Sequence, residues 1–482
     1  MDNNDQRNLS EQLLLLHELQ HPDLNTPYQR APIHRDMRSP DISRELRLLD
    51  TITVALTTGN PGDVFAAAFD KRKQMHLVLA KNGPPTPQDM AAATDLIFLI
   101  GSSAVTHALD IFPFLMHRCG ANINKRIHNL HTSILDGQDN YFTSALEAYH
   151  PGTNITNEFP TAGVLLEEYG DAVPPFATVW GDFVEKITDK TAQGLYTGDV
   201  SGGASTLADK YATIVLLADA LVHSRFLKAL VGDLNLTKKD CKERAEKLRR
   251  RLNKVCEYIR DVTHLIRKGK RLFPIPHRWV TEVFTGTGER VLNLCDNVDD
   301  ALLRGLNLPL FTPAITYKLN NQFPSISSNW KTQQMVHPCI HAELRIIFHL
   351  GPPSATEHAV QPIGVSKRCC FCCTLWIEAH NHIFQTQWLT SKSHDKPYVN
   401  WALPGAACSY DGTRSVDRAV LRDVSMRLTD TLDWLFLQKR PSDELYSGGT
   451  RSDNTSGGEQ ELDWRKRMHK RATWVTIKDR KT

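Results

Sequence analysis

The residues best suited to chemistry are a histidine and a glutamate in His-x-Glu spacing, followed later by cysteines in Cys-x-x-Cys spacing. The first two are His341 and Glu343, and four cysteines lie within residues 369–373. Two thiols in the first turn of a helix meet at one point, where the helix dipole favours their thiolates. One histidine at a second helix start completes three zinc ligands and leaves the fourth position open for water, as in a catalytic site.

Glu343 suits proton transfer at such a site. It lies two residues after His341, at the same helix start, so its carboxylate can sit beside the water without being a ligand. Zinc lowers the pKa of bound water to about 7, which makes the water reactive at neutral pH.

The cysteine run allows more than one ligand set. Cys369 with Cys372 and Cys370 with Cys373 have the same spacing. A closed structural zinc held by all four thiolates is a third arrangement. Because four cysteines so close in sequence would be strained around one ion, we expect an open site with two cysteine ligands.

Together the motifs resemble the zinc deaminase superfamily, whose signature is His-x-Glu followed by Cys-x-x-Cys. More closely, the sequence is similar to a deaminase-like family that is widespread in fungal genomes and was first grouped with an Orientia effector-type domain. That family has a strand ending in Ile-Gly-x-Ser-Lys, here residues 363–367, then a later histidine and a Trp-x-x-Pro motif, here His394 and residues 401–404. The resemblance covers about residues 305–440.

The resemblance implies a ligand set and an activity. The family places its first cysteine ligand three positions after the lysine of Ser-Lys, which selects Cys370 and Cys373, with His341, as ligands of Zn²⁺. Glu343 would take a proton from the water and pass it to the ring nitrogen and the leaving ammonia. The expected activity is hydrolytic deamination of cytosine or adenine in a nucleotide or a single-stranded nucleic acid.

The resemblance also points to substrate-binding positions. His394 and Trp401 fall on loops that can reach the mouth of the pocket. Trp401 can stack on a base, with core packing as the alternative. Many deaminases have proline directly before the first cysteine ligand, whereas this chain has Cys369 there. That departure bears on the choice of substrate.

The rival function is a catalytically silent, zinc-stabilised module that binds protein or nucleic acid. Glu343 argues against it, because a purely structural zinc site has no need of a buried carboxylate beside the metal. A toxin or conflict effector is a third hypothesis, by analogy with the family.

The composition is that of a globular protein. Of the 482 residues, 41% are hydrophobic and 23% charged, and the net charge is only +3. These values exclude a wholly disordered chain and do not demand a nucleic-acid or membrane partner. No apolar run reaches the roughly 18 residues of a membrane span, and the acidic N-terminus lacks a secretory signal. We therefore expect an intracellular protein, cytoplasmic or nuclear.

Hydrophobic periodicity divides the chain into parts. Residues 1–40 are expected to be disordered around one short helix over 11–21, and residues 41–280 to form an all-helical region of unknown role, with one helix over 64–80. Residues 305–440 alternate strand-like runs with helix-like runs. The strands are expected over 314–319, 361–365 and 384–389, and the helices over 342–350, 370–383 and 414–437. The basic tail over 441–482 is expected to be disordered.

The predicted fold class is therefore α plus α/β. A mostly helical N-terminal region precedes a cytidine deaminase-like α/β/α domain over 305–440, with a mixed sheet flanked by helices.

The most regular helix is expected over 238–271. An apolar stripe runs along it, and the segment is basic, with fourteen Lys/Arg against five Asp/Glu. A solvated helix face, a nucleic-acid contact and a nuclear targeting signal are three interpretations of this charge. The protein partners of the helical region cannot be named from its sequence.

Overall fold

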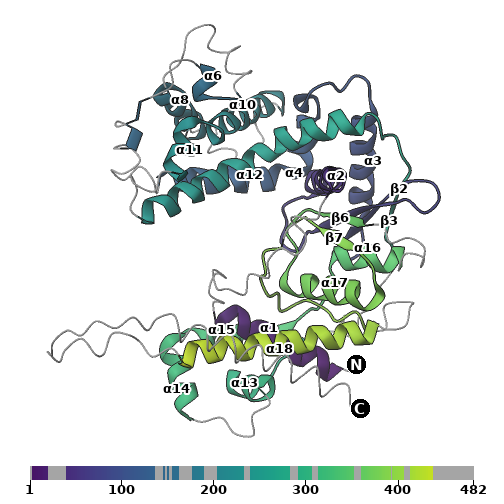
Figure 1. Ribbon diagram of the computed structural model, residues 1–482, viewed down its shortest axis with the longest axis vertical. Helices are drawn as coiled ribbons and strands as arrows, with labels where there is room; N and C mark the ends of the chain where they lie inside the picture. Colours follow the sequence, from purple (N-terminus) through teal and green to yellow (C-terminus); the bar gives the residue numbers. More distant parts are fainter. Residues whose placement is uncertain are drawn as a thin grey trace, which may run out of the picture. The chain divides into compact units, whose positions relative to one another are not determined.

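The computed structural model describes residues 3–19, 39–135, 145–146, 149–150, 155–161, 176–188, 204–232, 239–282, 291–306, 313–351, 360–391, 393–405 and 413–437 (Figure 1). The chain divides into two compact units, Met1–Thr431 and Leu432–Thr482. The predicted tail over 441–482 lies outside the described residues.

Helices make up most of the described structure. In chain order they are α1 (Asn3–Glu18), α2 (Pro40–Leu56), α3 (Pro87–Gly101), α4 (Ala108–Leu135), α6 (Ile155–Glu158), α8 (Phe176–Thr188), α10 (Ala204–Val222), α11 (Arg225–Gly232), α12 (Lys239–Gly269), α13 (Val298–Leu306), α14 (Pro313–Gln322), α15 (Ile326–Thr332), α16 (Ala342–Leu350), α17 (Phe371–Phe384) and α18 (Thr413–Leu437). The helices predicted over 238–271, 342–350, 370–383 and 414–437 are confirmed as α12, α16, α17 and α18. None of these helices combines the length and apolar character needed to cross a membrane.

Five short strands form one mixed sheet in the order β3-β2-β1-β6-β7. They are β1 (Phe65–Asp70), β2 (His76–Lys81), β3 (His277–Trp279), β6 (Gln361–Val365) and β7 (Trp388–Thr390); β4 (Leu292–Asn293) and β5 (Met335–Val336) form a separate pair. β1 is antiparallel to both of its neighbours, whereas β2 with β3 and β6 with β7 are parallel. The predicted mixed sheet is present, but it is not confined to residues 305–440.

Three strands of the sheet come from the region predicted to be all helical. β1 and β2 lie over residues 65–81, where one helix is predicted over 64–80, and β3 lies near the end of the region. β1 is rich in alanine, a strong helix former, yet it is buried along its length between α2 and α16, which flank the sheet (Figure 1). A strand buried on both faces shows no alternation, so periodicity does not separate it from a buried helix. The all-helical prediction for 41–280 is wrong at these strands.

Two predicted strands also differ from the structure. Residues 314–319 belong to α14, which has Pro313 at its first position, where proline is favoured. The strand expected over 384–389 begins only at Trp388, because α17 continues to Phe384. That helix ends at Gln385 in the left-handed region, with φ of 51°.

The N-terminal segment holds a buried helix that is longer at its start than the short helix predicted over 11–21. α1 begins at Asn3, earlier than the predicted start at residue 11, and its four leucines over 13–16 are fully buried. Consecutive buried leucines lie on all sides of a helix, so α1 must be enclosed by neighbours. Helices α13 and α15 are among them.

α2 lies against the backbone of β6. A Cβ added to Gly364 would come within 2.3 Å of the carbonyl carbon of Leu49, so only glycine allows this approach. Asp50 Oδ1 in α2 accepts a hydrogen bond from Val365 N at 2.8 Å. This contact ties α2 to the strand that leads into the cysteine run.

The helical region is a sequence insertion between two paired strands of the sheet. Helices α3 to α12 follow β2 in the chain and precede β3, the strand that pairs with β2. Within the insertion, α12 packs on α4 and α10. The buried residues of its apolar stripe face these neighbours, which accounts for the regular spacing of leucine and valine in the sequence.

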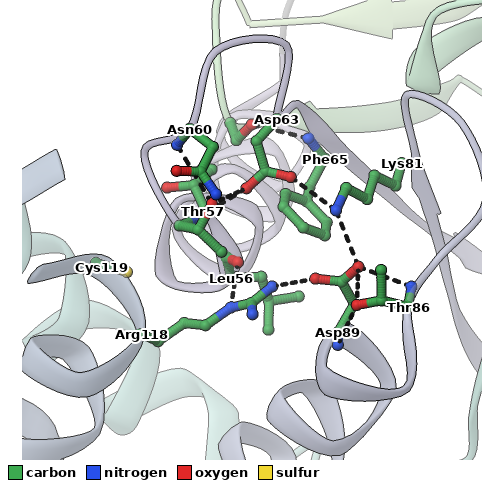
Figure 2. A network of polar contacts seen from close by, with 12 residues as sticks. Leu56, Thr57, Asn60, Asp63, Phe65, Lys81, Thr86, Asp89, Arg118 and Cys119 are labelled. Atoms are coloured by element: carbon green, nitrogen blue, oxygen red, sulfur yellow. Dashed lines mark hydrogen bonds and ion pairs between the residues drawn. The ribbon is translucent and has the colours of Figure 1, made fainter. Parts of the chain in front are cut away.

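Two buried carboxylates and two cations join the end of β2 to α3 and α4 (Figure 2). Lys81 Nζ lies 2.9 Å from Asp63 Oδ1 and 3.0 Å from Asp89 Oδ2. Arg118 pairs with the other oxygen of Asp89 and donates from Nε to the Leu56 carbonyl at 2.7 Å. Each carboxylate therefore has a cation beside it, as the cost of burying charge requires.

The network makes the fold sensitive to acid. Burial alone would raise the pKa of Asp89, but hydrogen bonds from Thr86 and from the two cations lower it to about 2. Because this pKa lies below that of an unfolded aspartate, the carboxylate adds stability above about pH 4. That contribution is lost as the pH falls through about 2.

We expect Lys81→Met to lower the free energy of unfolding by about 3 kcal/mol, because it leaves Asp63 without a cation in a buried site. Urea denaturation at pH 7 measures this change. Lys71→Met is the matched control, since Lys71 pairs with Glu45 at an exposed position and should cost less than about 1 kcal/mol. Equal losses in the two variants would contradict the role given to the network.

Candidate metal centre

Two helices begin at the candidate metal centre. α16 starts directly after His341, and α17 starts directly after Cys370. His341 Nδ1 lies 3.5 Å from Cys370 Sγ and 3.3 Å from Cys373 Sγ. The three ligand atoms lie within 4.8 Å of one another, and all three side chains are buried. Of the two cysteine pairs with the right spacing, the structure brings this one to the histidine.

The start of α16 is held by a side chain from the turn after β2. His341 occupies the N-cap position, but its own side chain makes no cap hydrogen bond. Instead Asn82, the residue after β2, accepts a hydrogen bond at Oδ1 from Ala342 N at 2.8 Å. This bond satisfies one of the free N–H groups of the helix start. The imidazole of His341 is thereby left to face the cysteines.

Cys370 caps the start of α17. Its Sγ accepts a hydrogen bond from Cys373 N at 3.4 Å. Burial alone would raise the pKa of the Cys370 thiol, but Cys373 and the neighbouring His341 lower it. Burial opposes protonation of His341, yet the charge of Cys370 raises the pKa of the imidazole. Burial and the charge of Cys370 raise the pKa of the Cys373 thiol. Two thiols and an imidazole form a donor set that suits zinc.

Glu343 lies in the same buried region, one helical residue beyond Ala342. Its side chain is 3% exposed, and among the described residues its Oε2 has no hydrogen-bond partner. Burial and the charge of Glu343 raise the pKa of the neighbouring Cys369 thiol, which hydrogen-bonds to the carboxylate. Cys369 therefore keeps its proton and supports the carboxylate.

Trp401 is fully buried beside the cysteines. Its indole Nε1 donates to Cys373 Sγ at 3.2 Å. The loop that carries it pairs with the segment before His341, since Cys339 N donates to the Asn400 carbonyl and Ala402 N donates to the Cys339 carbonyl. Of the two predicted roles for Trp401, base stacking and core packing, this placement corresponds to packing against the candidate ligands.

His394 and Tyr398 lie on the outer side of the centre. His394 Nδ1 accepts a hydrogen bond from Lys396 N at 3.0 Å, which leaves the proton of the neutral ring on Nε2. Burial, helped by the charge of Lys396, lowers the pKa of His394. The Tyr398 ring makes edge contacts with His341 at 6.2 Å and with His394 at 5.6 Å between centroids. Tyr398 is 41% exposed, so it is the aromatic ring that solvent reaches.

Asp417 in α18 connects the cysteine helix to the loop after Trp401. Its Oδ1 accepts from Trp376 Nε1 in α17 at 3.0 Å, and its Oδ2 accepts from Gly405 N at 2.7 Å. The side chain is fully buried, and this burial raises its pKa to about 6 despite both bonds. α18 thus holds two parts of the centre in place.

Sequence reasoning missed Asn82, Tyr398 and Asp417. The Asn82-Gly83 dipeptide signals a turn, and nothing local shows that it caps a helix about 260 residues later. Tyr398 lies between the two motif residues His394 and Trp401, so its position in the chain was the available signal. Asp417 lies in a helix with ordinary periodicity, so its sequence position gives no signal of its role.

The comparison with known families bears on this site. Residues 340–405 match the model of the OTT_1508-like deaminase family. The deaminase-like segment contains His341, Glu343, Cys370 and Cys373, together with the loop of Trp401. No curated protein and no solved structure matches the chain. The protein therefore carries a deaminase-like segment with a buried cluster that can hold a metal ion.

We expect Cys373→Ser to lose bound zinc and Cys372→Ser to keep it. Both thiols are fully buried in the first turn of α17, but only that of Cys373 lies beside His341. Metal analysis of the purified full-length variants, with the wild type at about one zinc per chain, measures the difference. Retention by Cys373→Ser with loss from Cys372→Ser would assign the other cysteine pair.

Asp417 should make stability depend on pH. Its folded-state pKa of about 6 exceeds the ordinary value of 3.8, so between these values the folded state binds a proton that the unfolded state does not. The folded state therefore loses stability as the pH rises from about 4 through 6. Relative to Asp417→Asn, the wild type should lose about 2 kcal/mol between pH 4 and pH 7. Denaturation of both proteins with a chelator present measures this difference, and parallel pH profiles would contradict it.

Proposed function

We propose that the protein is a zinc-dependent hydrolytic deaminase that acts on cytosine or adenine in a nucleotide or nucleic acid. The observation that carries the proposal is Glu343, which is buried, has an Oε2 without a partner among the described residues, and acts by its charge on His341, Cys370 and Cys373. A structural metal site would gain nothing from that carboxylate, because burying a carboxylate oxygen without a hydrogen-bond donor is costly. The deaminase-like segment over 340–405 supports the same activity.

His341, Cys370 and Cys373 would hold the zinc ion. Bound zinc supplies Lewis acidity, which lowers the pKa of water towards 7. Glu343 accepts a proton from the water at its free oxygen and delivers it to the ring nitrogen next to the amino group. The water oxygen forms a bond to the ring carbon, the carbon–nitrogen bond of the amino group breaks, and ammonia leaves with the second proton of the water. Cys369 holds the carboxylate in position by hydrogen bonding.

The outer residues favour a substrate that carries phosphate. Tyr398 offers an exposed aromatic ring beside His341 and His394, which suits stacking on a base. Arg368 and Lys396 are exposed, and their charges act on His394. Two cations next to an aromatic ring match the phosphate and the base of a nucleotide, with Asp395 as an acidic neighbour that also acts on His394.

We expect Glu343→Gln to reduce deamination at least about 100-fold while zinc stays bound, because the amide cannot accept the proton. Ammonia release from cytidine, adenosine, their monophosphates and short single-stranded RNA and DNA measures the activity. Glu282→Gln is the control. Glu282 lies outside the centre, and its carboxylate makes a hydrogen bond with His349 of α16, the helix that also carries Glu343.

Two results would count against the proposal. One is full activity in Glu343→Gln. The other is a zinc-loaded wild type that releases no ammonia from any of these substrates, which would favour the catalytically silent binding module.

A further inference from the structure

One helix outside the deaminase-like segment reaches the metal centre. In α1, Gln6 Nε2 donates to the Trp401 carbonyl at 2.9 Å, and Gln6 Oε1 accepts from Leu403 N at 2.7 Å. Both bonds are buried, and Gln6 is fully buried itself. A single carboxamide thus satisfies the donor and the acceptor of one loop, as a neighbouring strand would.

That loop carries the side chain that touches a candidate ligand. The two Gln6 bonds fix the backbone on both sides of Ala402, directly beside Trp401. The indole of Trp401 then donates to Cys373 Sγ at 3.2 Å. A tryptophan has a single N–H, which is fixed in the plane of its ring. Because the Trp401 ring is fully buried, a shift of its backbone also shifts the direction of this N–H. Three hydrogen bonds therefore connect α1 to the sulfur of Cys373.

α1 itself is anchored away from the centre. Glu11 is 1% exposed and accepts bonds from Arg304, at 2.9 Å and 2.8 Å from one guanidinium nitrogen, and from Cys295 N at 2.9 Å. Gln6 Nε2 also contacts Ser10 Oγ at 3.2 Å, which orients the carboxamide from within the helix. The helix therefore has a fixed position from which Gln6 can hold the loop.

We propose that Gln6 is a positioning residue of the metal centre, which holds the Trp401 N–H on the sulfur of Cys373 and so sets the affinity of the site for zinc. The proposal rests on the metal site proposed above, but it does not depend on the substrate. Groups that orient a metal ligand typically change metal affinity 10–100-fold when they are removed. A loose indole would leave the thiolate without its donor and free to turn.

The test measures metal binding by the full-length chain. Gln6→Ala should weaken zinc affinity about 10-fold in competition with a chelator, and Trp401→Phe, which removes the N–H, should weaken it at least as much. In the cobalt-substituted protein, both variants should shift the thiolate-to-metal charge-transfer band. Gln6→Glu keeps the acceptor for Leu403 N but loses the donor to the Trp401 carbonyl, so it serves if Gln6→Ala does not fold.

Gln12→Ala is the matched control. Gln12 is a nearly buried glutamine in the same helix, and among the described residues its Oε1 has no hydrogen-bond partner. It should lower stability without changing zinc affinity or the cobalt spectrum. Equal affinity losses in Gln6→Ala and Gln12→Ala would mean that α1 acts only through general stability, and would overturn the proposal.

A double-mutant cycle tests the route through Trp401. If Gln6 acts through the indole, Gln6→Ala combined with Trp401→Phe should bind zinc no more weakly than Trp401→Phe alone. Additive losses would overturn that route, as would unchanged affinity and spectrum in Gln6→Ala. A wild-type chain that binds no zinc would instead remove the metal site of the proposed function, so the two failures are distinguishable.

Discussion

The structure depends on holding three polar donors together in a water-excluded interior. An imidazole and two thiols within 4.8 Å of one another, with a carboxylate nearby, would be costly to bury without compensation. The neighbouring elements compensate this cost with hydrogen bonds. Asn82, after β2, accepts one from the start of α16, and the Trp401 indole donates one to Cys373 Sγ. In α17, the backbone N–H of Cys373 donates to Cys370 Sγ. A bound metal ion would balance the remaining charge of His341, Cys370 and Cys373.

The local parts of the centre could be predicted because their signals are local. The spacings of His341 with Glu343 and of Cys370 with Cys373 are properties of single helix starts, and α16 and α17 begin where these motifs predict. The cysteine pair that meets His341 is the one selected by family resemblance, since spacing alone left two pairs open.

The long-range parts could not be predicted. β1 and β2 have no alternation because they are buried on both faces, so periodicity does not distinguish them from a helix. Gln6 and Trp401 are 395 positions apart, and the hydrogen bond between them follows only from how the loop and α1 pack. For Trp401, both proposed roles suited its sequence position, and its burial separates them.

The helical insertion and the deaminase-like segment are coupled by charge. α12 carries the predicted basic face, on which Arg250 and Lys254 follow one another on successive turns. Burial lowers the pKa of Lys254, and the positive charges of Arg126 and Arg368 lower it further. Because Arg368 lies just before the cysteine run, the charge of the insertion and that of the deaminase-like segment act on each other. The contact of this face with nucleic acid stays a prediction.

The position of the insertion has a consequence for the making of the protein. The central strand β1 pairs on one side with β2, which follows within a few residues, and on the other side with β6, about 300 residues later. At roughly 5–20 residues per second, a ribosome needs about 15–60 s to supply that partner. During this time an emerging β1–β2 hairpin has an open edge, which is a hazard for pairing with other chains. The helices α3 to α12 are synthesised in the same interval, and local contacts allow helices to form early. The strand that waits longest for a partner during synthesis is thus β1, which is buried in the centre of the finished sheet.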